Sequence, residues 1–214
     1  MTFSNDRPLL RGYFHLVAAI AAVFGCVGLI LLADSPTAYV GGAVFAASLI
    51  ALYSVSATYH TIPWGRRMQA VLKRADHSMI FVLIAGSYTP LCLLAIGGAW
   101  GIAMLAVVWT IAAFGIAMKV AWPNVPRWLS VGVYMGMGWL GVLAATQNIA
   151  WFELSTATLL IGGGLLYTIG GVIYGLRRPN PFPRVFGYHE VFHLLVIGGS
   201  VLHYTLVAAF LMRA

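Results

Sequence analysis

Seven long apolar runs, separated by short connectors, dominate the pattern of this chain. A helix needs about 20 mostly apolar residues to cross a bilayer, and each run reaches that length. The first run is longer than the core of a signal peptide and no small-residue cleavage pattern follows it, so we interpret it as a spanning helix. The pattern predicts an all-α membrane protein, one domain over residues 1–214 folded as a seven-transmembrane helix bundle. The predicted spans are 10–33, 39–60, 77–97, 99–121, 129–149, 155–176 and 189–212.

The composition of the 214 residues agrees with a lipid solvent. Hydrophobic residues make up 61% of the chain and charged residues only 8%, against about 25% in a typical soluble domain. The mean hydropathy is +0.91. The net charge of +7 does not indicate nucleic acid, because the basic residues lie in short connectors. Cys26 and Cys92 both fall inside apolar runs, so we expect neither a disulfide framework nor a cysteine metal site.

The basic residues favour one orientation of the bundle. If the seven spans alternate in direction, eleven of the 12 Lys and Arg residues fall at the ends that share a side with the N-terminus. The opposite ends hold only Arg213, together with Asp34 and Glu153. Positive charge accumulates on the cytoplasmic side of membrane proteins. We therefore expect a cytoplasmic N-terminus and an external C-terminus.

Two histidines open the last apolar run, His189 and His193. Four residues on a helix correspond to about 40° of rotation and about 6 Å of rise, so both imidazoles project from one face. Two histidines at that spacing are half of a metal site. The alternative is one interfacial histidine and one that is hydrogen-bonded inside the bundle.

Further polar residues share the depth of this pair. His60 ends the second predicted span and Asp76 directly precedes the third, so the topology places both at the cytoplasmic end with His189 and His193. Three imidazoles with one open position are typical of catalytic zinc, although imidazole also suits copper, iron and nickel. Asp76, as a carboxylate that is not itself a ligand, would hold and deprotonate the water on the metal.

Ser56 lies one helical turn before His60, on the same face. It would hydrogen-bond an imidazole, or orient the water or a substrate carbonyl. The alternative for Ser56 is a packing residue bonded to its own backbone. The alternative for Asp76 is a helix-terminal residue paired with Arg74 or Lys73.

Three other histidines carry weaker indications. His77 points about 100° away from Asp76 on a helix and is expected at the interface. His15 lies in the cytoplasmic half of the first span and receives no role. His203 is about 15 Å beyond His193, too far to share its ion, and is expected to be hydrogen-bonded or to line a cavity.

The string from His189 to His193 also matches the H-E-x-x-H motif of zinc proteases, in which the glutamate is the general base. The extended motif requires a further histidine where this chain has Gly199, and no acidic residue follows His193. The protease reading is therefore disfavoured. We expect Glu190 to face Arg184 or Arg178, or to favour the positive end of its helix.

These residues together resemble the hemolysin III family, the bacterial relatives of the progestin and adipoQ receptors. The resemblance implies a seven-helix protein of the bacterial plasma (inner) membrane with a cytoplasmic N-terminus. It implies zinc bound by His60, His189 and His193, with Asp76 contacting the water on the metal. It also implies kinship with membrane hydrolases that include alkaline ceramidases. The residues that carry it are Ser56-x-x-x-His60, Asp76, Gly86-Ser87-Tyr88-Thr89-Pro90 and His189-x-x-x-His193.

Two functions remain open at this point. One is a zinc-dependent hydrolase that cleaves an amide or ester bond of a membrane lipid in the cytoplasmic leaflet, with catalytic Asp76 and Ser56. Its partner would be a membrane lipid or fatty-acyl ligand within the bundle. The other is a non-enzymatic sensor of membrane state, receptor or channel-like protein, in which zinc only clamps the helices together.

Overall fold

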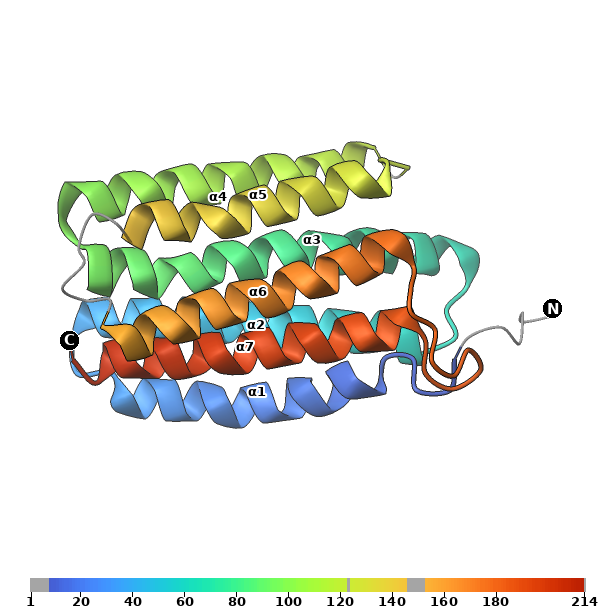
Figure 1. The fold of residues 1–214 in the computed structure, drawn as a ribbon, viewed down its shortest axis with the longest axis horizontal. Helices are drawn as coiled ribbons and strands as arrows, with labels where there is room; N and C mark the ends of the chain where they lie inside the picture. The colour runs from blue at the N-terminus through green and yellow to red at the C-terminus, as the bar shows by residue number, and fades with distance from the viewer. Residues whose placement is uncertain (1–7, 123, 146–152, 214) are drawn as a thin grey trace.

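The computed structural model describes residues 8–122, 124–145 and 153–213. The regular elements within these ranges are helices, apart from one isolated β-bridge between Phe182 and Phe186 (Figure 1). The elements are α1 (Tyr13–Leu32), α2 (Pro36–Thr61), α3 (Arg66–Pro90), a π-helical segment η1 (Leu91–Ile96), α4 (Gly98–Ala121), α5 (Arg127–Ala145), α6 (Leu154–Leu176) and α7 (Tyr188–Leu211).

Six segments of the described chain are long and apolar enough to cross a membrane. Five are α1, α2, α4, α6 and α7, and the sixth is the continuous segment of α3 and η1. The described part of α5 spans 19 residues and is the seventh helix of the bundle. The prediction of an all-α membrane protein with seven helices is confirmed. The side of the membrane on which each terminus lies stays a prediction.

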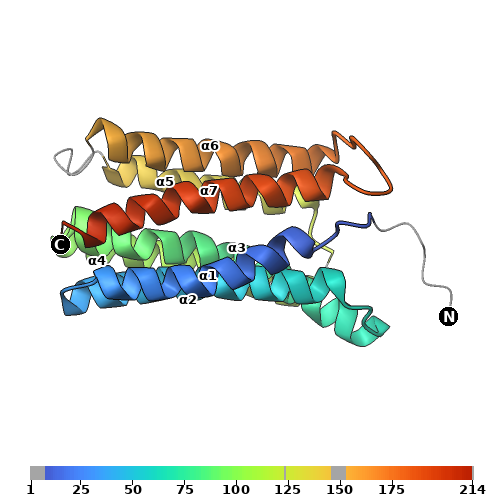
Figure 2. The ribbon, with the colours of Figure 1, turned by 90° about the horizontal axis from the view of Figure 1, so that it is seen from below.

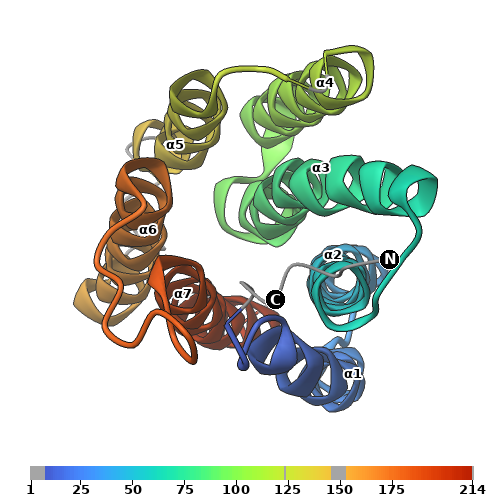
Figure 3. The same ribbon diagram turned by 90° about the vertical axis from the view of Figure 1, so that its right-hand side faces the viewer.

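The helices run back and forth along one long axis (Figures 1 and 2). Helix α3 packs against α2, α4 and α5, while α7 packs against α6 and α1. The N-terminal segment and the connectors α2–α3, α4–α5 and α6–α7 lie at the same end, which faces the viewer in Figure 3. We call it the basic end, because its helix ends and connectors hold Arg11, Arg66, Arg67, Lys73, Arg74, Lys119, Arg127, Arg177, Arg178 and Arg184.

Local sequence signals fix several helix ends. Ser35 caps α2 by accepting a hydrogen bond from the Ala38 amide at 3.2 Å, and Pro36 follows at the first helical position, where its missing amide costs nothing. Gly97 has φ +67°, a left-handed conformation that glycine adopts without strain, and it separates η1 from α4.

The helix that contains the third predicted span begins before that span. Helix α3 begins at Arg66 rather than at residue 77, so the connector from α2 is only residues 62–65. The prediction delimited the span by hydropathy alone. Arginine, lysine and glutamine are good helix formers, so the helix continues for about three turns beyond its apolar part. The predicted range 129–149 of the fifth span extends past Ala145, and its last residues lie outside the described residues.

Candidate metal centre

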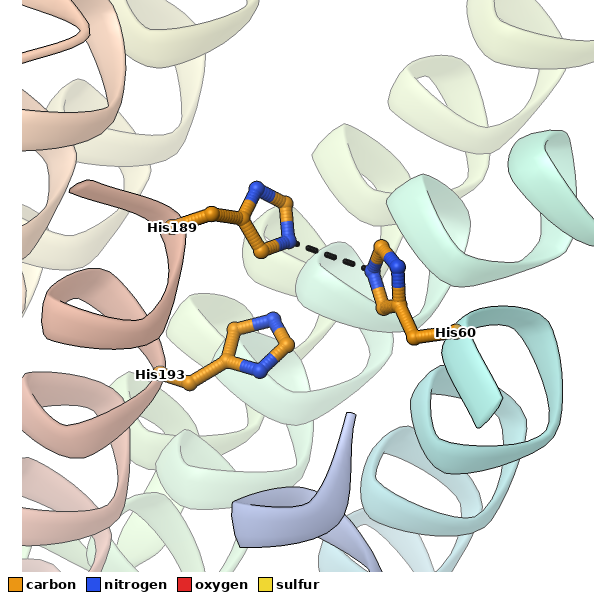
Figure 4. Close-up of side chains that lie close together, drawn as sticks. All are labelled: His60, His189 and His193. Atoms are coloured by element: carbon orange, nitrogen blue, oxygen red, sulfur yellow. Dashed lines mark hydrogen bonds between the residues drawn. The ribbon is translucent and has the colours of Figure 1, made fainter. Parts of the chain in front are cut away.

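Three histidine side chains converge at the basic end. His60 lies in the last turn of α2, and His189 and His193 lie in the first two turns of α7 (Figure 4). Each offers one ring nitrogen such that all three nitrogens lie within 4.8 Å of one another. His60 Nε2 and His189 Nε2 are 3.1 Å apart. The ring centroids of His189 and His193 are 4.5 Å apart, and those of His60 and His193 are 5.3 Å apart.

The chain brings these rings together by helix direction and by a close backbone approach. The C-terminal end of α2 and the N-terminal end of α7 both lie at the basic end of the bundle (Figure 3). His60 therefore meets His189 and His193, which share one face of α7 because they are four residues apart. The N-terminal segment then crosses His60 at Gly12, which has φ +87°. A β-carbon at Gly12 would stand only 2.7 Å from the His60 β-carbon, so only glycine fits there.

The geometry and the donor set fit a metal ion. Tetrahedral zinc with bonds of about 2.0–2.1 Å to nitrogen separates two ligand nitrogens by about 3.3 Å. The 3.1 Å between His60 Nε2 and His189 Nε2 is close to that spacing. His193 is 2% exposed, and its Nδ1 is buried with no hydrogen-bond partner within the described residues. A metal bound by one nitrogen of the His193 ring would satisfy only that nitrogen, so the case for a metal rests on the spacing of the three rings and on their neutral nitrogen donors.

Asp76, the predicted carboxylate, stands beside the three rings. Its Oδ2 is 3.9 Å from His60 Nε2 and 3.9 Å from His77 Nδ1. Ser56 is 2% exposed and lies within interaction range of the Asp76 carboxylate. The ion pairs among the described residues include none between Asp76 and Lys73 or Arg74, the alternative that the sequence left open.

A long cavity begins at this cluster. Its volume is about 160 Å³, and it lies mainly between α3, α5, α6 and α7, with α1 and α2 contributing His15, Leu52 and Ser56. Ser56, Asp76, His189 and His193 line its end near the centre, and mostly apolar residues line the rest. Along α7 the lining continues from His189 to Phe210, which corresponds to about 30 Å of helix. The polar cluster therefore opens into an elongated apolar space.

Comparison with known proteins identifies the family. A family model described as Haemolysin-III related matches residues 3–204. The chain belongs to this family. The resemblance predicted from the sequence is confirmed.

Relatives of this haemolysin-III-related chain come from bacteria and animals. It is 33% identical to "Hemolysin-3 homolog" of Bacillus subtilis (strain 168) over 201 residues, which cover 92% of this chain and 91% of that protein. It is 32% identical to "Hemolysin-3" of Bacillus cereus over 222 residues, which cover 99% of this chain and 95% of that protein. It is 31% identical to "Adiponectin receptor protein" of Drosophila melanogaster over 181 residues, which cover 76% of this chain and 40% of that protein. Family and helices together make it a multi-pass membrane protein.

Glu190 of the haemolysin-III-related chain does not face the three rings as a protease base would. It is fully buried, forms an ion pair with Arg11, and accepts a hydrogen bond from the Gly187 amide at 2.7 Å. The prediction that Glu190 faces Arg184 or Arg178 was wrong, because the N-terminal segment folds back and brings Arg11 to α7. The expected position at the positive end of the helix is correct.

His15 was missed by sequence reasoning as a neighbour of the centre. It is 3% exposed and stacks on His193 with ring centroids 3.6 Å apart and planes 9° apart. Neither of its ring nitrogens has a hydrogen-bond partner within the described residues. The available signal was its depth, since His15 lies one turn into α1 at the same end as His193.

The other two histidines take internal positions. His77 bonds Tyr174 Oη through Nε2 at 3.0 Å and the Lys73 carbonyl through Nδ1 at 2.6 Å, and it lines the cavity. Its side chain is 19% exposed, and the expectation that it lies at the membrane interface stays a prediction. His203 contacts the Leu160 carbonyl at 3.3 Å and lines the cavity farther along α7, as expected.

Proposed function

We propose that this chain is a zinc-dependent hydrolase that cleaves an amide or ester bond of a membrane lipid. The observation that carries the proposal is the position of the three-histidine cluster and Asp76 at one end of a long apolar cavity. A purely structural metal site has no need of such a cavity. The cavity gives the proposed substrate, a membrane lipid or fatty-acyl molecule, a place for its chain.

His60, His189 and His193 would hold the metal, and they leave room for a fourth position. Zinc bound there supplies a Lewis acid and makes water acidic enough to lose a proton near neutral pH. Asp76 would take a proton from a water molecule at the site and would give it to the leaving group of the substrate. Ser56, one turn from His60, orients the carboxylate or the substrate carbonyl.

The placement of the site in the membrane follows from the charge of the basic end. With that end in the cytoplasm, the reacting bond would lie in the cytoplasmic leaflet of a bacterial inner membrane. The mostly apolar lining of the cavity would hold the acyl chain of the substrate. The acyl chain therefore positions the lipid in the cavity, while Asp76 and Ser56 act on the bond near the lipid headgroup.

The decisive test replaces Asp76 by Asn in purified protein. Asp76→Asn keeps the shape of the side chain and removes the base, so we expect zinc content to stay the same. Turnover of long-chain amides and esters in lipid nanodiscs should fall by about 100-fold or more, the usual contribution of a positioned base. Asp34→Asn, an exposed change at the opposite end, is the control and should leave turnover unchanged. If neither wild type nor variant hydrolyses any substrate of that panel, the hydrolase proposal is wrong.

One observation favours the non-enzymatic alternative, a sensor of membrane state, receptor or channel-like protein. Asp76 Oδ2 is only 3.9 Å from His60 Nε2, so a small movement would make Asp76 the fourth ligand and close the metal shell. The zinc affinity of Asp76→Asn separates the two functions. A loss of affinity similar to that of a ligand histidine variant would favour the structural clamp, and unchanged affinity favours the hydrolase.

A further inference from the structure

Three cations at the basic end have no acidic partner among the described residues. Lys119 lies in the last turn of α4 and is 6% exposed, and its Nζ donates to Ser130 Oγ on α5. Arg127 begins α5, and Lys73 lies in the second turn of α3. The described ion pairs use Glu190, Asp76 and Glu153 with other partners. Positive charge therefore accumulates between α3, α4 and α5, and none of these three cations is ion-paired within the described residues, although the Asp76 carboxylate lies 3.9 Å from the neighbouring His77 ring.

An aromatic framework connects these cations to the cavity. Lys119 Nζ stands 5.6 Å from the centroid of the Tyr134 ring, and the Arg127 guanidinium lies 4.9 Å from that of Tyr174. Tyr134 Oη donates to the His77 carbonyl at 2.9 Å, and Tyr174 Oη contacts His77 Nε2 at 3.0 Å. Tyr134, Tyr174 and His77 all line the cavity. The cations thus stand directly behind its wall at the basic end.

The three charges act at one place. The charges of Lys73, Lys119 and Arg127 all act on the His77 imidazole, and Lys73 also acts on Lys119. The backbone of Lys73 is held there as well, because its carbonyl accepts from His77 Nδ1 at 2.6 Å. The positive charges of Lys73, Lys119 and Arg127 repel one another, so a nearby negative charge would stabilise this arrangement.

The general preference for positive charge on the cytoplasmic side does not explain Lys119. That preference is satisfied by exposed side chains such as Arg66. A lysine near a membrane surface usually extends its stem so that the ammonium reaches water. Lys119 is instead buried, and the one hydrogen bond described for its ammonium, which carries three donors, is to the Ser130 hydroxyl. A buried charge without a counter-charge is costly, and a bound anion would offset that cost.

We propose that Lys73, Lys119 and Arg127 form a binding site for a phosphate-type anion beside the cavity at the basic end. Lysine binds such a group as a point charge, and the arginine fork can hold two of its oxygens. The phosphate of an anionic lipid and free inorganic phosphate share this chemistry. The site uses neither the three histidines nor Asp76, so it stands apart from the proposed hydrolase.

The test measures lipid binding to the full-length protein by mass spectrometry of intact complexes. The probes are phosphatidic acid and phosphatidylcholine with identical acyl chains. We expect wild type to prefer phosphatidic acid, and Lys119→Gln and Arg127→Gln each to weaken that binding by about tenfold, equivalent to about 1.4 kcal/mol. Phosphatidylcholine binding should not change. Lys119→Arg keeps the charge and should retain the preference, and Arg66→Gln is the matched control at the same end.

The outcomes separate the ligand sources and the two proposals. If inorganic phosphate displaces phosphatidic acid, the site recognises the phosphate group alone. If it does not, the site requires the whole lipid. Both outcomes support an anion site. Retained binding in His193→Ala would show that the site stands even if the metal centre fails. Equal losses in Arg66→Gln and Arg127→Gln would show general surface attraction and overturn the proposal. Unchanged binding of phosphatidic acid in Arg127→Gln would also overturn the proposal. This variant keeps the test decisive if Lys119→Gln does not fold.

Discussion

His193 is the residue on which the contacts of the candidate centre converge. Its ring stacks on His15, faces His60 and His189, and lines the cavity. It is almost completely buried, and its Nδ1 has no hydrogen-bond partner within the described residues. A ring held on so many sides has little freedom to turn, so its nitrogens are presented to the centre in a fixed orientation.

Replacing His193 by Ala should therefore remove the metal. With only His60 and His189 left, we expect bound zinc to fall from about one per chain to less than about a tenth, because catalytic zinc sites use three protein ligands. The measurement is metal analysis of protein purified without chelator. His203→Gln is the control, since His203 is also a cavity-lining histidine of α7 but contacts the Leu160 carbonyl instead. Equal zinc in wild type and His193→Ala would contradict the assignment.

The sequence predicted which histidines meet but not which residue supports them. His189 and His193 share a helix face by their spacing, and the alternation of spans brings His60 to the same depth. Contact with His15 depends on the rotation of α1 about its own axis. Helix α1 is apolar on all sides, so no polar stripe in the sequence indicates which face meets α7.

At the scale of elements, the first turn of α7 is connected to the segment that precedes α1. Leu9 and Leu10 donate backbone hydrogen bonds to Arg184 and Val185 at 3.0 and 3.2 Å. The Arg11–Glu190 ion pair lies beside these bonds. The lengths of α1, α2, α4, α6 and α7 follow from their apolar runs and could be predicted. The Arg11–Glu190 contact joins residues that are 179 positions apart, and no local pattern indicates it.

Breaking the Arg11–Glu190 pair should destabilise the protein without removing the metal. Glu190→Ala leaves the Arg11 charge without its partner and the Gly187 amide without its acceptor, so we expect a loss of about 3–5 kcal/mol in the free energy of unfolding. The measurement is unfolding by sodium dodecyl sulfate in mixed micelles, with zinc content determined in parallel. Glu190→Gln keeps an acceptor for Gly187 and should lose less. If Glu190→Gln is as stable as wild type but inactive, Glu190 is a base of the protease type after all.

At the scale of the whole molecule, the two ends of the bundle differ in chemistry. The basic end carries the histidine cluster, the polar end of the cavity and nearly all the basic side chains of the described residues. At the opposite end, Arg213 pairs with Glu153 at 3.0 Å and Asp34 is exposed. The sequence predicted this asymmetry because alternation of the spans assigns each connector to a side. The cavity could not be predicted, since its walls combine side chains from six α-helices and from η1.

The asymmetry makes the orientation testable with two cysteine variants. Arg67→Cys places a thiol at the basic end and Asp34→Cys places one at the other, and both positions are exposed. Native Cys26 and Cys92 lie within membrane-capable helices and provide the unlabelled background. With the basic end in the cytoplasm, a membrane-impermeant maleimide should label Asp34→Cys in intact cells and Arg67→Cys only after lysis. The reverse pattern would put the candidate centre on the external side and exclude a substrate from the cytoplasmic leaflet. Equal labelling of both before lysis would mean that the chain inserts in both directions, so the basic residues would not determine its topology.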